Sequence, residues 1–134
     1  MPALTADRNT PMRGGELIPV PVAANTKIFA GALVAANATG FCVPGSVATT
    51  LTYLGRAESL VDNTGGVDGA KIIMVRRHKA FKFANYATDA VTQAEFGKSC
   101  YIVDDQTVAK TNGTNTRSAA GKVVGVDNDG VWVE

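Results

Sequence analysis

The stretch VGVDNDGVWVE contains the residues of this chain that most resemble a metal site. Asp127, Asp129 and Gly130 look like a fragment of an EF-hand calcium loop. Such a loop needs oxygen ligands at alternating positions, a glycine at the sixth position and a bidentate glutamate at the twelfth. With Gly130 as the sixth residue, the first ligand position falls on Gly125. With Asp127 as the first residue, the sixth is Trp132. Neither register works, so the acidic residues predict a hairpin turn between aliphatic strands.

Two other acidic or glycine-rich stretches have the residue types of an active site but not the arrangement. Asp104 and Asp105 are adjacent, and adjacent residues in an extended chain point to opposite faces. They therefore cannot share a proton as a carboxylate dyad does. The TGGVDG stretch at 64–69 lacks the lysine and serine of a phosphate loop and precedes a predicted strand. It offers a phosphate no helix N-terminus, and both stretches predict turns or loops.

The histidine and cysteine content argues against catalysis and metal binding. His78 is the only histidine and no GxSxG motif is present, so neither a serine triad nor a multi-histidine metal site is predicted. Cys42 and Cys100 each lie in an apolar run, which predicts buried, reduced thiols. We therefore expect no catalytic, metal or cofactor site, and rank an enzyme with an unrecognised site last among the alternatives.

The segment from Lys71 to Lys82 is the strongest charge feature of the chain. It holds five cations, and no acidic residue lies between Asp68 and Asp89. Cations with phenylalanine and tyrosine nearby suit single-stranded nucleic acid, so a small β-barrel nucleic-acid-binding module is the alternative function. A solvated rim or a contact with an acidic protein surface is the other interpretation. The formal net charge of +1 gives no overall field that would attract nucleic acid, and we expect no nucleic-acid partner.

Trp132 alternates with two valines on the last predicted strand and must face away from whatever those valines bury. It predicts either a second core layer or an interface anchor, since large aromatic residues are enriched at interfaces. The sequence leaves these two interpretations open.

The elements that would position these residues are mostly strands. Alanine, valine, threonine and 14 glycines dominate, which predicts an all-β, compact barrel- or sandwich-like domain of eight to ten short strands. Longer strands are predicted at Thr50–Ala57 and Lys71–Ala84, with Ile72–Val75 buried on both faces. A single short helix is predicted to begin at the capping box Thr92–Glu95 and to end at Gly97. Three hairpins are predicted, with turns at Asn37–Gly40, Asp104–Gln106 and Asp127–Gly130.

The first sixteen residues differ from the rest of the chain. Met1–Glu16 is polar and has no periodicity, so it predicts an extended arm, followed by a single β domain over residues 17–134. Leu17–Val22 contains Pro19 and Pro21, which predicts an edge strand or an extended crossover. No signal peptide and no segment of membrane-spanning length is found, so we expect synthesis in a cytoplasm and no membrane partner.

The order of several segments resembles the small capsid decoration proteins, also called cement or head-stabilising proteins, of Mu-like and related tailed phages. The resemblance covers nearly the full length. It lies in LTADRNTP, GELIPVPVAANTKIFAGALVA, GFCVPG, LGRAESLVDNTGGVDGA with the following VRR, GKSCYIVDDQTVAKT and GKVVGVDNDGVWV. At Cys42 and Cys100 the chain departs from the small apolar residues that the family pattern leads us to expect.

The resemblance implies a compact β-barrel-like domain with an extended arm, on the outside of an icosahedral shell. It implies a symmetric oligomer, a trimer in preference to a dimer, that binds the major capsid protein where capsomers meet. We expect the arm to become ordered on a neighbouring subunit. The candidate capsid or subunit contacts are Leu4, Thr5, Arg8, Arg13, Arg76, Arg77 and Trp132.

Overall fold

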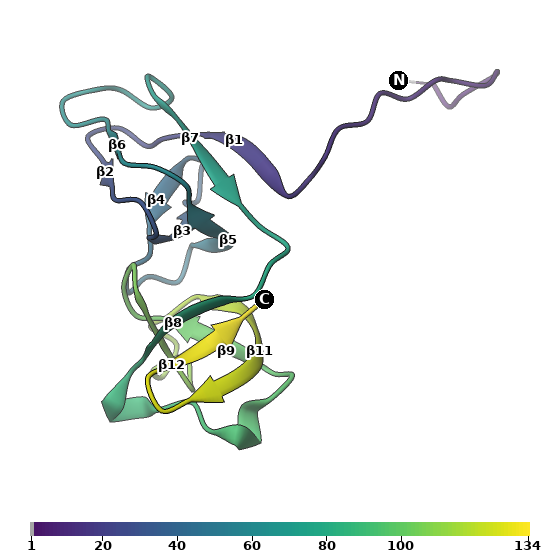
Figure 1. Cartoon of the computed structure of the whole chain (residues 1–134). Helices are drawn as coiled ribbons and strands as arrows, with labels where there is room; N and C mark the ends of the chain where they lie inside the picture. The colour runs from purple at the N-terminus through teal and green to yellow at the C-terminus, as the bar shows by residue number, and fades with distance from the viewer. Residues whose placement is uncertain (1) are drawn as a thin grey trace.

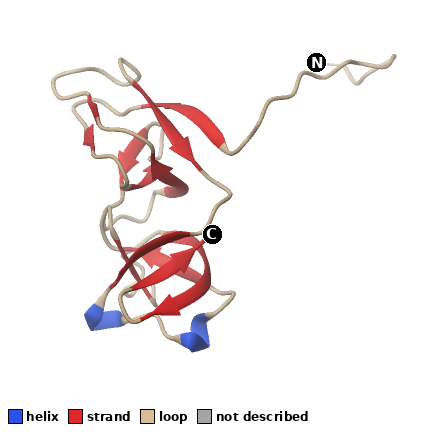
Figure 2. Cartoon of the chain, in the orientation of Figure 1, coloured by secondary structure: helices blue, strands red, loops and turns tan. Residues whose placement is uncertain are grey.

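The chain folds into two strand-rich halves with an extended arm (Figure 1). The computed structural model describes residues 2–134, and within that range it contains twelve strands and two single-turn 3-10 helices. Figure 2 shows that both helical turns lie at the end of the molecule farthest from the arm. The prediction of an all-β fold with barrel architecture is confirmed.

The first half is a five-stranded sheet in the order β1-β7-β5-β3-β4. A parallel bridge between Val22 and Cys42 joins its two ends, so the sheet curls around its own apolar core. A two-stranded pair, β2 with β6, lies beside it. The strands of this half are β1 (Leu17–Pro21), β2 (Lys27–Ile28), β3 (Leu33–Ala36), β4 (Cys42–Pro44), β5 (Thr52–Ala57), β6 (Val61–Asp62) and β7 (Ile72–Arg76).

The second half is a closed five-stranded barrel in the order β10-β8-β12-β11-β9. Its pairs are antiparallel except β8 with β10, which run parallel. Two 3-10 turns, η1 (Ala87–Asp89) and η2 (Gln93–Glu95), connect β8 to β9. The barrel strands are β8 (Phe81–Asn85), β9 (Ser99–Ile102), β10 (Thr107–Ala109), β11 (Ala119–Asp127) and β12 (Gly130–Val133).

Strand β3 contributes to the cores of both halves. Side chains alternate along a strand, and Leu33 and Ala35 lie in the barrel core while Val34 lies in the core of the first sheet. All three residues are fully buried. The two cores therefore share one strand.

Local sequence patterns correctly predicted the three hairpins and the helical turn. The pairs β3–β4, β9–β10 and β11–β12 are antiparallel and flank the three predicted turns. Thr92 and Glu95 form the expected capping box, although the helix is only one 3-10 turn. β1 is an edge strand of its sheet, as its prolines predicted.

The predicted strand Lys71–Ala84 is wrong as one element. It is two strands, β7 and β8, that belong to different halves of the molecule. The connector between them turns at His78, whose φ of 61° is left-handed. The prediction that Ile72–Val75 is buried on both faces is also wrong, because Ile72 is 61% exposed and Met74 is 37% exposed. β7 lies in a sheet that has one face toward a core and the other uncovered.

Candidate functional site

The arm does not pack against the rest of the molecule. All residues from Pro2 to Glu16 are exposed, and Figure 1 shows this segment leading away from β1. Its links to the folded part are at Glu16, whose carbonyl accepts from the Arg77 backbone N–H and whose carboxylate lies 3.3 Å from Lys79 Nζ. Four predicted contact residues lie along this arm: Leu4, Thr5, Arg8 and Arg13.

The arm joins an uncovered apolar surface of the first sheet. In the β1–β7 register Leu17 lies opposite Arg76, Pro19 opposite Met74 and Pro21 opposite Ile72, all on the outer face. The remaining β1 residues face the core. We call the five apolar residues of this face the apolar strip: Leu17, Pro19, Pro21, Ile72 and Met74.

The two prolines also shape the open edge of the sheet. Val22 N–H donates to the Lys71 carbonyl and Arg77 N–H donates to the Glu16 carbonyl. Antiparallel pairing alternates, so the even-numbered residues of β1 hydrogen-bond with β7 and the odd-numbered residues face outward. Pro19 and Pro21 therefore occupy outward positions, where the missing N–H leaves the edge unable to donate.

The predicted basic segment is largely neutralised by carboxylates. Arg76 Nε lies 3.3 Å from Glu58, Lys79 pairs with Glu16, and Lys82 Nζ lies 2.8 Å from Asp129. Arg56 donates to Glu58 as well, and that hydrogen bond is the main cause of a lowered Glu58 pKa. Within residues 2–134, only Lys71 and Arg77 of the five cations lack a carboxylate within 4 Å.

The terminal hairpin is organised around Lys82. The ammonium group lies 2.8 Å from Asp129 Oδ1 and 3.7 Å from Asp127 Oδ2. The Asp129 pKa is lowered and the Lys82 pKa is raised, in each case mainly by their mutual hydrogen bond. The two aspartates that resemble a calcium loop are thus paired with an amine. The described residues hold no cluster of three or more His, Cys, Asp or Glu side chains placed to share a metal ion.

Trp132 lies on the outer face of the barrel rather than in a second core layer. It is 38% exposed, whereas Val131 and Val133 on either side are fully buried. Its indole N–H donates to Asp127 Oδ2 at 2.8 Å, and Lys82 Nζ lies 5.7 Å from the ring centroid. Trp132 therefore belongs to a different half of the molecule from Arg76 and the arm, so the structure does not gather the predicted contacts into one surface.

A pocket of about 540 Å³ lies at the seam between the two halves. We call it the seam pocket. Arg77 and His78 come from the β7–β8 connector, and Arg77 Nε donates to His78 Nε2 at 3.2 Å. Tyr53 from β5 packs against the barrel core, and its hydroxyl is buried without a hydrogen-bond partner. The lining residues are Thr52, Tyr53, Leu54, Arg77, His78 and Glu134.

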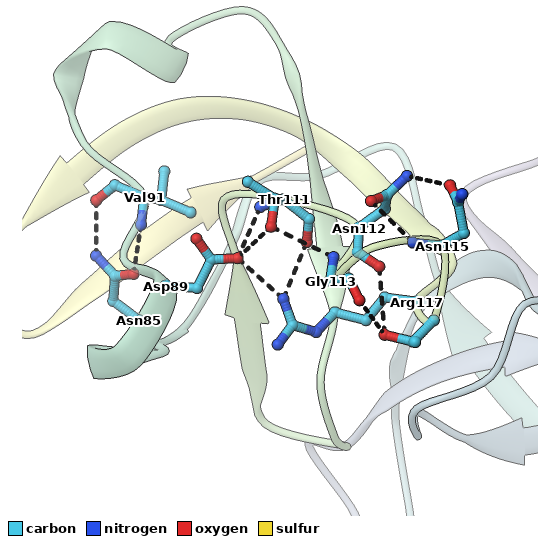
Figure 3. A network of polar contacts seen from close by, with 9 residues as sticks. Asn85, Asp89, Val91, Thr111, Asn112, Gly113, Asn115 and Arg117 are labelled. Atoms are coloured by element: carbon cyan, nitrogen blue, oxygen red, sulfur yellow. Dashed lines mark hydrogen bonds and ion pairs between the residues drawn. The ribbon is translucent and has the colours of Figure 1, made fainter.

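A polar network holds the loop after β10 against η1 (Figure 3). Asp89 accepts hydrogen bonds from the Thr111 hydroxyl and backbone, and Arg117 Nη1 lies 2.9 Å from the same carboxylate. The Thr111 hydroxyl is the main cause of a lowered Asp89 pKa, with Arg117 contributing. Sequence reasoning missed this network because its members are 22 to 28 residues apart.

Both cysteines are buried, reduced thiols, as predicted. Cys42 lies in the core of the first sheet and Cys100 in the core of the barrel. Burial raises the pKa of each thiol to about 12. Neither can supply a thiolate nucleophile at neutral pH in the folded protein.

Comparison with protein-family models, with characterised proteins and with solved structures found no significant match. No helix within residues 2–134 is both long enough and apolar enough to cross a membrane.

Proposed function

We propose that this chain is a structural virion protein that decorates and stabilises the outer surface of a tailed-phage icosahedral capsid. It forms a symmetric oligomer, a trimer in preference to a dimer, and binds the major capsid protein at capsomer junctions. It requires no cofactor and no catalytic step. This function is suggested by several sequence segments that resemble those of decoration proteins and follow one another in the same order along the chain.

The observation that carries the proposal is the exposed arm that leads directly into the apolar strip. Arm and strip are continuous at Glu16–Leu17, and both are uncovered in the single chain. Exposed apolar surface of this kind marks interaction sites, and an extended segment can become ordered as a strap or strand on a partner. The described arm, fifteen residues from Pro2 to Glu16, extends about 50 Å at roughly 3.3 Å per residue. It can therefore reach well beyond its own domain.

Such a protein stabilises a shell by mass action. It binds surface that exists only in the assembled, expanded shell, so binding favours that state over its dissociated subunits. Simultaneous contacts by the members of one oligomer add avidity to a modest energy for each site.

The test begins with purified heads of a tailed phage that encodes this chain. We expect the protein to co-sediment with heads on a density gradient and to be visible on their outer surface by electron cryomicroscopy. Sedimentation of the purified chain gives the oligomeric state. Absence of the protein from purified heads would overturn the proposal.

Two variants then test the surface. Deletion of residues 2–15 should weaken binding to heads assembled without the protein, and circular dichroism should remain unchanged because the arm makes no core contacts. Ile72→Asp should also weaken binding, whereas Leu60→Asp, at a residue of similar exposure outside the strip, should not. If Ile72→Asp and Leu60→Asp weakened binding equally, the apolar strip would not be part of the binding surface.

The nucleic-acid alternative is less well supported by the charges. Three of the five cations in the basic segment are paired with carboxylates. Titration with single-stranded DNA across salt concentrations discriminates between the two functions, because a nucleic-acid binder loses affinity steeply as salt rises.

A further inference from the structure

The seam pocket has the dimensions and the polar groups of a ligand site. Its volume of about 540 Å³ falls in the range of roughly 300–1,000 Å³ that ligand pockets occupy. Its lining combines an arginine, a histidine, a glutamate, a threonine and a tyrosine with one leucine. The pocket lies away from the apolar strip residues, none of which lines it.

Arg77 is the group in this pocket that is free to bind a ligand. Its neighbours Arg76 and Lys79 are paired with carboxylates, but among residues 2–134 no carboxylate lies within 4 Å of the Arg77 guanidinium. Its one side-chain hydrogen bond uses Nε, which donates to His78. Both terminal NH₂ groups therefore remain available, and guanidinium binds carboxylates with paired, parallel hydrogen bonds.

The backbone holds His78 in the position that orients Arg77. A φ of 61° at a residue with a side chain is uncommon, although histidine tolerates it better than most. Backbone conformations of this kind persist where the surrounding structure determines them, and they cluster at binding sites. Here the left-handed residue places an imidazole acceptor 3.2 Å from Arg77 Nε. This exposed hydrogen bond favours one orientation of the guanidinium before any ligand arrives.

We infer that the seam pocket binds an acidic peptide segment of a protein partner, with a side-chain carboxylate paired to Arg77. Thr52 is exposed and supplies a hydroxyl on the same lining. Tyr53 contributes to the wall of the pocket, and its buried hydroxyl lies against the barrel core. Glu134 carries the one side-chain carboxylate among the lining residues. Its negative charge disfavours a compact, multiply charged anion. A peptide suits the site better, because its backbone N–H groups can donate hydrogen bonds to the Glu134 carboxylate. The inference goes beyond the proposed function, in which capsid binding runs through the arm and the strip. Arg77 is the one lining residue that also belongs to the predicted capsid or subunit contacts.

The experiment uses the full ¹⁵N-labelled chain and two short peptides. Acetyl-Gly-Asp-Gly-amide should shift the amide resonances of the β5 and connector residues that line the pocket. Acetyl-Gly-Asn-Gly-amide, which lacks the charge, should shift them at least about tenfold more weakly, as expected for the loss of a charged hydrogen-bond pair. Equal binding of the two peptides would overturn the inference.

Variants and a third probe locate the binding group. Arg77→Gln should lower affinity for the aspartate peptide at least about tenfold, and Arg77→Lys should lower it less, because lysine keeps the charge but loses the paired geometry. Lys71→Gln removes the other cation of the segment from Lys71 to Lys82 that lacks a carboxylate partner among the described residues, and it should leave the affinity unchanged. The spectra of each variant report directly whether it is folded. Retained affinity in Arg77→Gln, or inorganic phosphate binding the same residues as tightly as the peptide, would overturn the assignment of a peptide site.

Discussion

At the scale of single residues, the Asp89 network is the polar cluster whose removal should cost most stability. Asp89→Asn should lower the free energy of unfolding by about 1–3 kcal/mol, because the partly buried Arg117 loses its charged partner and the Thr111 contacts weaken. Urea denaturation followed by Trp132 fluorescence measures the change. Asp105→Asn is the matched control, since the described part of the chain makes no hydrogen bond to the Asp105 side chain. A loss no greater than that of the control would contradict a structural role for the network.

The same carboxylate predicts a pH dependence. The folded-state pKa of Asp89 is lowered, first by the Thr111 hydroxyl and then by Arg117. Its contribution is therefore complete above the unfolded aspartate pKa of about 3.9 and is lost as pH falls through the lower folded value. The stability difference between wild type and Asp89→Asn should shrink as pH drops below about 4. A difference that stayed constant down to pH 2 would argue against an ionic contribution.

A second residue-scale prediction concerns Gly55, where β5 passes the end of β7. A Cβ atom at this position would lie 2.2 Å from the Arg76 carbonyl oxygen, and the φ of 149° already disfavours a side chain. Gly55→Ala should cost about 3 kcal/mol or more, since backbone must move. Gly31→Ala is the control, because Gly31 has a φ of 85° but open space around it, and it should cost about 1–2 kcal/mol. Thermal melts of the two variants give the comparison, and equal losses would show that crowding at Arg76 is unimportant.

At the scale of elements, turn chemistry and proline placement were readable from the sequence. The Asn37–Gly40 and Asp127–Gly130 turns are short-range signals, and each joins the antiparallel pair that it predicted. The division of residues 71–84 between two sheets was not readable, because both strands have strand-like composition. The left-handed turn at His78 gives no proline or glycine signal.

The seam pocket and the Asp89 network were hidden for the same physical reason. Tyr53, Arg77 and Glu134 meet only because two halves of the chain pack together, and Asp89 meets Arg117 across 28 residues. Neither arrangement has a local pattern. The prediction of buried cysteines succeeded because apolar flanking residues are a local signal of burial.

An element-scale prediction follows from the proline edge of β1. Replacing Pro19 and Pro21 together with valine supplies outward N–H donors to the open edge and increases β propensity. Edge-to-edge association should increase, and sedimentation velocity should show species larger than those of the wild type at equal concentration. Pro11→Val, in the exposed arm, is the control. An unchanged distribution in the double variant would mean that the missing donors do not limit association at this edge.

At the scale of the whole molecule, the shared strand β3 raises the question of whether the two halves unfold together. Leu33 and Ala35 belong to the barrel core and Val34 to the first core. The Ser118 hydroxyl strengthens the seam by accepting from Leu51 N–H and donating to the Ala48 carbonyl. A strand that cannot leave one core without leaving the other favours a single cooperative transition, as expected for one domain over residues 17–134.

The two cysteines provide one reporter for each core. Each thiol has a pKa of about 12 when buried, so each should react with a thiol reagent only when its own core opens. Pulse labelling across a urea series, read by peptide mass spectrometry, should give the same midpoint for Cys42 and Cys100. Thr39→Cys, at an exposed turn, controls for reagent activity and should label without urea. Leu33→Ala should lower both midpoints together by an amount equivalent to about 2–5 kcal/mol. If only the Cys100 midpoint moved, the halves would be separate folding units and β3 would be a link between two domains rather than the shared wall of one.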